Sequence, residues 1–155
     1  MTFQIHALPA APFADLFALS DAALQRQGMR RVIADANPGF PCRVSLQDAE
    51  IGEDLVLVNY RHLDGSTPYA ASHAIYVRKA AEQSQPPPGE VPAVRATRLL
   101  SVRAYDDQNL MVAADVTDGK DLALLVDAFF SNATVAVIHV HNARQGCFAA
   151  RVTRT

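Results

Sequence analysis

Apolar and polar residues alternate along the last stretch of the chain, residues 134–155, and this alternation predicts a β-hairpin. The apolar residues occupy even-numbered positions on both arms, and strand side chains alternate between the two faces of a sheet with period two. Even positions of both arms share one face only when the connecting loop has an odd number of residues. The loop Arg144-Gln145-Gly146 satisfies this condition and places Gly146 at a left-handed turn position, which glycine adopts without steric cost. The predicted pairs are then Ile138 with Val152 and Val140 with Ala150.

The odd-numbered positions of the same hairpin carry its polar side chains. In the predicted register His139 lies opposite Arg151, His141 opposite Ala149 and Cys147 opposite Ala143. The imidazole and guanidinium groups on this solvated face have no acidic residue among them, and arginine forks suit carboxylate and phosphate groups. The preferred hypothesis is therefore a small binding module, whose site for a small anionic or polar metabolite consists of His139, His141, Arg144 and Arg151.

Two further hypotheses use the same surface. His139 and His141 leave one face of a strand about 7 Å apart at Cα, so they are candidate ligands of zinc or iron, with the Cys147 thiolate as a third. The alternative function is a small metal- or thiol-dependent enzyme, in which Cys147 is also the candidate catalytic residue. The remaining alternative is a structural homodimer with this face as the subunit contact. The sequence itself specifies no cofactor and no substrate.

A second hairpin follows from the same parity argument. Even-numbered apolar residues of 94–106 and 110–117 are predicted to face one another across the loop Asp107-Gln108-Asn109, with Asn109 in the left-handed conformation. The next apolar residues have helical spacing: Leu122, Leu125, Val126, Phe129 and Phe130. They predict an amphipathic helix over about 119–131 that begins after a capping Asp118 and covers the sheet.

The first half of the chain predicts further strands and one helical segment. Residues 12–27 have helical spacing, with Ser20 as a cap inside the segment. Residues 55–60 include a run that is apolar on both faces, which predicts a central strand. A short alternating strand at 42–46 buries Cys42, Val44 and Leu46. Weaker strands are predicted at 3–8, 31–34 and 73–79, and an exposed proline-rich loop at 84–92.

Together these elements predict a single α+β domain over residues 1–155, with a mainly antiparallel sheet built from hairpins, an N-terminal helical segment and one amphipathic helix before the C-terminal hairpin. Half of the residues are apolar, which suits a folded core. The net charge of −2 argues against a nucleic-acid partner and against an anionic membrane. Without a basic signal segment or a bilayer-length apolar run, we expect a cytoplasmic protein whose two cysteines stay reduced.

Several stretches also resemble one family along the whole chain. They are Pro41–Leu46, Gly52-Glu53 with Leu55–Tyr60, Pro68-Tyr69, Ile75–Arg78, His139–Arg144 and Gly146–Phe148. With these stretches in this order, the chain resembles the bacterial domain of unknown function 1203 family. One departure is that family members often have Gly-Pro where this chain has His73-Ala74. The resemblance implies a bacterial protein of one domain, and it brings no activity, substrate or catalytic residue.

Overall fold

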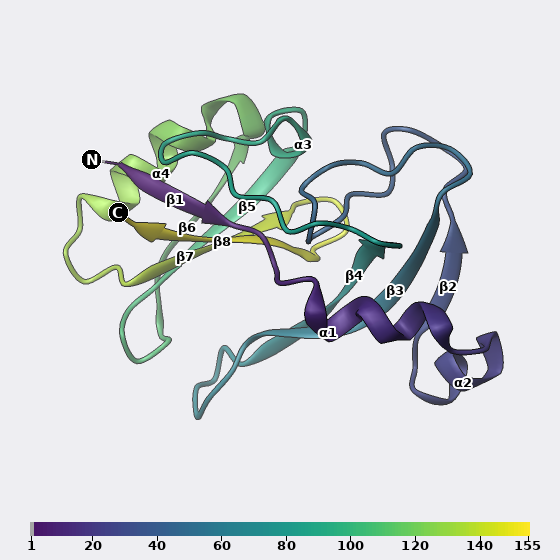
Figure 1. The fold of residues 1–155 in the computed structure, drawn as a ribbon. Coiled ribbons are helices and arrows are strands. Elements are labelled where there is room, and N and C mark those ends of the chain that lie inside the picture. Colours follow the sequence, from purple (N-terminus) through teal and green to yellow (C-terminus); the bar gives the residue numbers. More distant parts are fainter. Residues whose placement is uncertain (1) are drawn as a thin grey trace. The chain divides into compact units, whose positions relative to one another are not determined.

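Eight β-strands in two antiparallel sheets and four α-helices make up the chain over residues 2–155, the part that this computed structural model describes. The architecture in Figure 1 confirms the predicted α+β class, with a helix directly before a C-terminal hairpin. Contacts divide the chain into two compact units, each assembled from separate segments. The first unit holds the chain up to His6 with residues 61–73 and 85–155, and the second holds residues 7–60 and 74–84. The assignment of residues 1–155 to a single domain therefore stays a prediction.

The first unit is built on a five-stranded sheet with the strand order β1-β8-β7-β5-β6. Its strands are β1 (Phe3–His6), β8 (Phe148–Arg154), β7 (Val137–Asn142), β5 (Leu99–Tyr105) and β6 (Met111–Asp118). Val102 of β5 pairs with Val140 of β7, which pairs in turn with Ala150 of β8. All three side chains are buried, so one face of the sheet is apolar across its middle and forms the core of the unit.

Helix α4 (Leu122–Phe130) covers this apolar face, as Figure 1 shows. Arg154 lies on the same face as Val152, and its guanidinium carbon is 4.7 Å from the centre of the Phe130 ring. The same guanidinium group donates a hydrogen bond of 2.9 Å to the Phe130 carbonyl oxygen. Of the five residues that the helical spacing predicts for this face, three are buried, Leu122, Val126 and Phe130, and the other two, Leu125 and Phe129, are half-buried.

The start of this helix differs from the prediction in one respect. A 3-10 turn, η2 (Gly119–Asp121), precedes α4, and Asp118 makes no side-chain capping hydrogen bond to it. The turn is held instead by the Gly119 N–H, which donates to the Arg98 carbonyl oxygen at 2.8 Å. A Cβ at Gly119 would lie 1.8 Å from the carbonyl oxygen of Arg95 in the short helix α3 (Ala93–Ala96), so only glycine allows this approach.

The C-terminal hairpin has the predicted register in the half that is far from its turn. Ile138 pairs with Val152, His139 with Arg151 and Val140 with Ala150. Gly146 has a left-handed φ of 76°, as the turn prediction requires. The predicted three-residue loop is wrong, because the Asn142 N–H donates to the Cys147 carbonyl oxygen and leaves Ala143 to Gly146 as a loop of even length.

The even loop length changes the pairing next to the turn. His141 lies opposite Phe148 instead of Ala149, and Cys147 lies opposite Asn142 instead of Ala143. A β-bulge at Ala149 adds one residue to β8 and restores the predicted parity farther along the strands. Phe148 consequently shares a face with the hairpin histidines and not, as predicted, with the aliphatic residues.

The hairpin of β5 and β6 has the predicted three-residue loop, with Asn109 at a φ of 59°. Its facing residues differ from the prediction, because a register shift beside Ala104 leaves Val112 as an extra residue in β6. Even positions of β6 then share a face with odd positions of β5. Val112 and Val116 are accordingly 41% and 56% exposed. Ala96, also predicted for this strand, lies in α3.

The second unit is organised around a three-stranded sheet with β3 in its centre, as predicted for the strand that is apolar on both faces. The strands are β2 (Arg30–Ile33), β3 (Asp54–Leu63) and β4 (Ala71–Arg78). The N-terminal helical segment consists of α1 (Ala11–Ala14), the 3-10 turn η1 (Asp15–Ala18) and α2 (Asp21–Arg26). Ser20 caps α2 as predicted, since its Oγ accepts a hydrogen bond of 3.1 Å from the Ala23 N–H.

Residues 42–46 form a turn and not the predicted strand. The Leu46 N–H donates to the Cys42 carbonyl oxygen at 3.1 Å, and Leu46 has a left-handed φ of 52°. Cys42, Val44 and Leu46 are nevertheless buried, as the alternation predicts. The apolar pattern therefore identified the buried side chains correctly, whereas the backbone conformation depends on this local hydrogen bond.

Candidate metal centre

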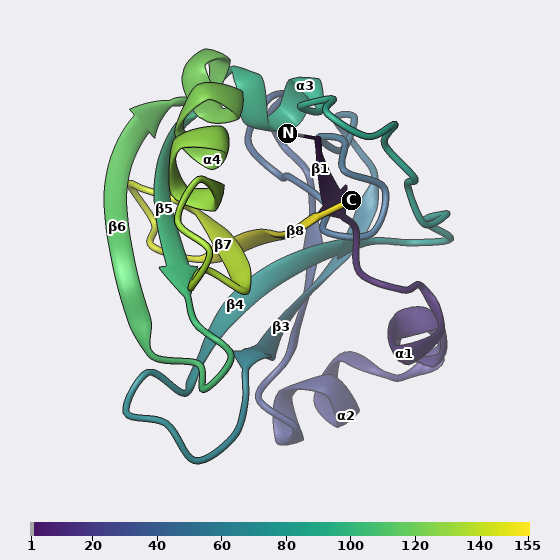
Figure 2. The ribbon, with the colours of Figure 1, turned by 90° about the vertical axis from the view of Figure 1, so that its left-hand side faces the viewer.

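Residues 61–73 belong to the first unit and consist of the end of β3, the following loop and the start of β4. We call them the covering segment, because they lie over the face of β7 that carries its odd-numbered residues. The loop of this segment is tied to the turn between β5 and β6, beside which it lies in Figure 2. Thr67 Oγ1 donates to the Asn109 carbonyl oxygen at 2.8 Å, and the Asn109 side-chain amide donates to the Asp64 carbonyl oxygen at 3.3 Å. Leu63 packs in one apolar cluster with Tyr105 of β5.

Four of the chain's five histidines meet beneath the covering segment. His62 and His73 come from β3 and β4, and His139 and His141 come from β7. The ring centre of His62 lies 4.7 Å from that of His73, 5.1 Å from that of His139 and 4.9 Å from that of His141. Phe148 stacks on the His62 ring, with the ring centres 5.0 Å apart. We call these four imidazoles the histidine cluster.

Two histidines of the cluster, His139 and His141, are buried and the other two are half-buried, which corrects the prediction of a solvated strand face. His139 and His141 are 3% and 0% exposed. The alternation within the hairpin correctly places both imidazoles on one face, but solvent reaches that face only if no other part of the chain covers it. Residues 61–73, which are distant in sequence, provide that cover.

Three ring nitrogens of the cluster are buried without a hydrogen-bond partner among residues 2–155: His62 Nε2, His73 Nδ1 and His141 Nε2. The ligand atoms of the same three histidines all lie within 4.8 Å of one another. Buried polar atoms in native proteins nearly always have a partner, and leaving one unpaired costs roughly 1–3 kcal/mol. These three histidines could therefore hold a single ion between them.

Hydrogen bonds on the other side of two of these rings fix the proton on His141 and are compatible with a lone pair on His62 Nε2. His141 Nδ1 lies 3.0 Å from the Gly146 carbonyl oxygen, which can only accept, so Nδ1 carries the proton and Nε2 carries a lone pair. His62 Nδ1 lies 2.9 Å from His139 Nδ1, and with the proton on His62 its Nε2 is also a lone pair. Histidines that bind metals characteristically donate their second N–H in this way, which fixes the orientation of the ring.

Burial keeps these imidazoles neutral. It is the main reason why the pKa of His62 is lowered to about 3, that of His139 to about 4 and that of His141 to about 2. The pKa of His73 is also lowered by burial, and the positive charge of Arg103 acts in the same direction on all four. The neutral imidazole is the form that binds a metal ion, so the cluster is in its binding form at neutral pH.

Cys147 does not belong to the group of candidate ligands. Its sulfur lies 3.7 Å from Asn142 Nδ2, which donates to it, and the group holds two histidines from outside the hairpin. Of the predicted ligands His139, His141 and Cys147, only His141 belongs to that group. Whether Cys147 serves as a catalytic thiol stays a prediction.

The predicted anion-binding residues are divided between two places. His139 and His141 lie in the histidine cluster, whereas both arginines are exposed. Arg151 lies on β8 opposite His139. Arg144 lies in the hairpin loop and lines a separate cavity of about 530 Å³ that Lys120 also lines. Whether these four residues bind an anion together stays a prediction.

His62 and His73 are the site residues that the sequence pattern did not indicate. The strand predicted at 55–60 leaves His62 outside and the strand predicted at 73–79 begins at His73, and no sequence pattern brings either imidazole to the C-terminal hairpin. One signal points to a hairpin between them, because the loop that separates them contains Asp64-Gly65. Extending the strands on both sides toward this loop would have brought the two imidazoles to the same end of that hairpin, though not to β7.

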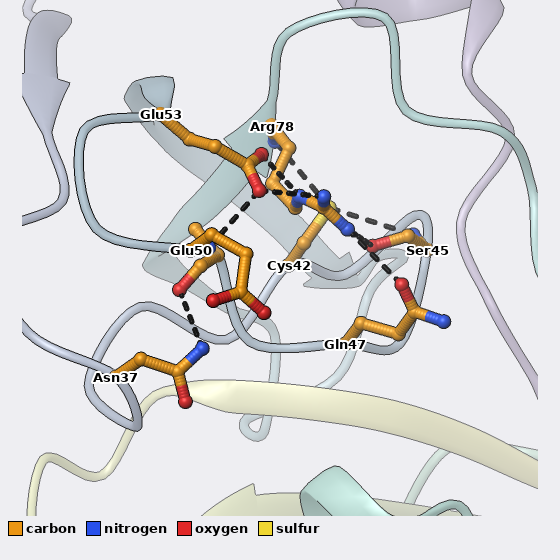
Figure 3. A network of polar contacts seen from close by, with 8 residues as sticks. Asn37, Cys42, Ser45, Gln47, Glu50, Glu53 and Arg78 are labelled. Carbon is orange, nitrogen blue, oxygen red and sulfur yellow. Dashed lines mark hydrogen bonds and ion pairs between the residues drawn. The ribbon is translucent and has the colours of Figure 1, made fainter.

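The second unit contains a polar network of a different kind, drawn in Figure 3. Arg78 forms two hydrogen bonds of 2.7 and 2.8 Å to the carboxylate of Glu53, and it also donates to Ser45 Oγ and Gln47 Oε1 at 3.3 and 3.1 Å. The hydrogen bonds from Arg78 are the main cause that lowers the pKa of Glu53. The sulfur of Cys42 accepts hydrogen bonds of 3.4 Å from the Arg78 and Ser45 N–H groups. These polar groups provide hydrogen-bond partners for one another, which indicates that the network has a structural role.

Comparison with known proteins adds a family and no activity. The family described as protein of unknown function DUF1203 matches residues 39–154. Comparison with curated proteins and with solved structures finds no match. Over residues 2–155, every helix is too short or too polar to cross a lipid bilayer.

Proposed function

Because the chain belongs to the DUF1203 family, whose function is unknown, we propose a function from the geometry of the histidine cluster alone. The first unit binds one divalent transition-metal ion, with zinc as the reference ion, through His62 Nε2, His73 Nδ1 and His141 Nε2. The observation that carries this proposal is the convergence of three buried ring nitrogens that have no hydrogen-bond partner among residues 2–155.

The spacing of the donors supports binding of one ion. Nitrogens bound to zinc at about 2.0–2.1 Å lie roughly 3.4 Å apart in a tetrahedral site. The three ligand atoms lie within 4.8 Å of one another, so small ring rotations bring them to an ion between them. Imidazole nitrogens suit zinc, copper, iron and nickel, whereas magnesium and calcium prefer oxygen ligands. The donor set therefore favours a first-row transition metal.

The number of ligands suggests what the bound ion does. Structural zinc sites use four protein ligands, whereas catalytic sites use three and keep one position open for water or substrate. A zinc ion in such a site polarises a bound oxygen and lowers the pKa of bound water to about 7. Three histidines thus support a metal-dependent enzyme with hydrolysis or hydration as its reaction class. The ligands predicted from the sequence are His139, His141 and Cys147. This proposal keeps His141 and replaces the other two with His62 and His73.

His139 has a supporting position, because its Nδ1 bonds to His62 Nδ1 on the side of the ring away from the free nitrogen. We therefore assign His139 to the orientation of His62 and not to direct binding of the metal.

Calorimetric titration of chelator-treated protein with zinc tests the proposal. We expect one ion per chain in the wild-type protein, and affinities weakened about 100-fold or more by His62→Gln, His73→Gln or His141→Gln. His139→Gln should weaken binding about 10-fold, as is usual when a residue that orients a metal ligand is removed. Circular dichroism of each variant checks that it is folded.

His6→Gln is the matched control for this series. His6 is the fifth histidine, and its Nε2 pairs with Thr153 Oγ1 at 2.8 Å, outside the histidine cluster. Its substitution should leave the zinc affinity unchanged. The proposal is wrong if the wild-type protein binds none of manganese, iron, cobalt, nickel, copper and zinc, or if the folded cluster variants bind zinc as tightly as the wild type.

Three other expectations remain proposals. A cytoplasmic location is supported only by the sequence pattern and a bacterial source only by the family resemblance, and cell fractionation tests the location. The homodimer through the C-terminal hairpin is tested by light scattering. The thiol-dependent alternative is tested by labelling, since a catalytic Cys147 should react faster at pH 7 than an ordinary cysteine with a pKa of about 8.5.

A further inference from the structure

Arg103 stands beside the histidine cluster on the neighbouring strand. In the pairing of β5 with β7, Arg103 lies opposite His139 and Ser101 lies opposite His141. Directly paired residues of antiparallel strands share a face, so the guanidinium leaves the sheet on the side of the imidazoles. Its Nε donates to Ser101 Oγ at 3.3 Å, and a hydrogen bond with Tyr105 also holds it. Arg103 is half-buried, as are His62 and His73.

The Arg103 guanidinium forms no ion pair with a carboxylate within residues 2–155. The guanidinium nevertheless lies on the sheet face of the imidazoles, directly opposite His139, which places it within electrostatic range of the proposed metal position. A dication and a guanidinium repel each other, and the repulsion is strong where water is partly excluded.

An anion between the two cations removes this repulsion. We propose that the open position of the metal takes an oxyanion, either a carboxylate or a phosphate, with one oxygen on the ion and a second oxygen on the Arg103 guanidinium. The inference rests on the metal site proposed above, and it names the class of substrate or inhibitor of that site. Arginine is suited to this role because its N–H groups match two oxygens of a carboxylate or phosphate. Arg103 is thus a binding residue for the anion, held in position by Ser101 and Tyr105.

Cobalt-loaded protein tests the inference, because the visible absorption of Co²⁺ reports both its binding and the exchange of its fourth ligand. The protein is titrated with acetate and, separately, with inorganic phosphate at constant ionic strength set by perchlorate. We expect saturable spectral changes in the wild-type protein. Arg103→Gln should weaken binding of the anion at least tenfold, whereas Arg103→Lys, which keeps the charge but loses the fork, should weaken it less. The anion that binds more tightly shows whether the site prefers a carboxylate or a phosphate.

The same variant gives a second readout that loss of structure would not produce. In perchlorate alone, Arg103→Gln should bind Co²⁺ at least threefold more tightly than the wild type, because the repulsion is gone. Arg26→Gln is the matched control: it removes an exposed arginine of α2 in the second unit and should change neither affinity.

The outcomes separate this inference from the proposed function. If the wild-type protein binds no Co²⁺ or Zn²⁺, the metal site and the anion site are both wrong. If the metal binds but the wild type shows no response to acetate or phosphate, or Arg103→Gln binds the anion as well as the wild type, only the anion site is wrong. An Arg103→Gln protein that binds Co²⁺ more weakly in perchlorate would also overturn it.

Discussion

The two units each contain a polar cluster, and the clusters differ in how completely their atoms are paired. In the second unit the Arg78 guanidinium and the Glu53 carboxylate hold each other with two short hydrogen bonds, and Ser45 and Gln47 occupy further donors of Arg78. In the first unit three imidazole nitrogens of the histidine cluster are buried without a partner among residues 2–155. Side chains of both clusters are at least partly buried, but only the cluster of the second unit supplies the hydrogen-bond partners of its own polar atoms.

This difference separates a structural network from a binding site. A buried polar group gains little net stability from a hydrogen bond and loses much when the bond is absent. A chain that only needed to fill the space under residues 61–73 could do so with apolar side chains. Three neutral imidazoles with converging lone pairs are better explained by a ligand that pairs all of them at once.

The largest effect that distinguishes the clusters is the response of stability to metal. Zinc at about a thousand times its Kd should stabilise the wild-type protein by about 4 kcal/mol, because the ion binds the folded state selectively. For a chain of this length that corresponds to a rise in Tm of roughly 10 °C. Glu53→Gln should keep this rise and His141→Gln should lose it, measured by differential scanning calorimetry with zinc and with chelator. An equal rise in His141→Gln would place the stabilising ion elsewhere.

The second effect is the pH dependence of stability in chelator-treated protein. The pKa values of His62, His139 and His141 in the folded state lie below the ordinary value near 6.5, so the unfolded state takes up protons first as the pH falls. The stability that these histidines contribute is therefore complete above pH 6.5 and is lost as the pH falls toward their folded-state pKa values, about 4 for His139, about 3 for His62 and about 2 for His141, by up to about 1.4 kcal/mol per pH unit for each histidine. Urea unfolding between pH 7 and 5 measures the slope.

His141→Gln sharpens this test, because it removes one titrating group. Its slope below pH 6.5 should be smaller than that of the wild type by up to about 1.4 kcal/mol per pH unit. Glu53→Gln should leave the slope in this range unchanged, since the pKa of Glu53 is lowered from a value that already lies below 5. Equal slopes in all three proteins would show that the buried imidazoles do not titrate as described.

The smallest expected effect is the loss of stability when the network around Arg78 and Glu53 is disrupted. Glu53→Gln leaves the partly buried guanidinium of Arg78 without its carboxylate and should destabilise the protein by about 1–2 kcal/mol, less than for a fully buried pair because both side chains are partly solvated. Glu50→Gln is the control, since its exposed carboxylate forms no ion pair within residues 2–155 and its substitution should cost less than about 0.5 kcal/mol. Denaturant midpoints compare the two, and equal midpoints would mean that the network contributes no stability.

The parts of the fold that the sequence predicts correctly are those that depend on local chemistry. The parity of the C-terminal hairpin predicts the pairing of Ile138 with Val152, and the turn preferences of Gly146 and Asn109 are confirmed by their left-handed φ angles. Helical spacing predicts the buried stripe that begins at Leu122. Each of these features is decided by residues close together in the chain.

The features that the sequence did not predict depend on contacts between distant residues or on single added residues. The bulge at Ala149 leaves the outer register unchanged and is invisible in the alternation, yet it moves Phe148 onto the histidine face. His62 and His73 reach the cluster because the loop between them is bonded to Asn109. Local periodicity carries no information on that contact, so half of the candidate site could not be foreseen.

The most direct test of the account is anomalous diffraction at the zinc absorption edge from crystals grown with zinc. The account predicts one strong peak in the first unit, at about 2.0–2.1 Å from His62 Nε2, His73 Nδ1 and His141 Nε2. Density for a fourth, non-protein ligand should lie on the side of Arg103. A zinc-saturated crystal with no peak at these three nitrogens, or with its peak bound by Cys147 instead, would contradict it.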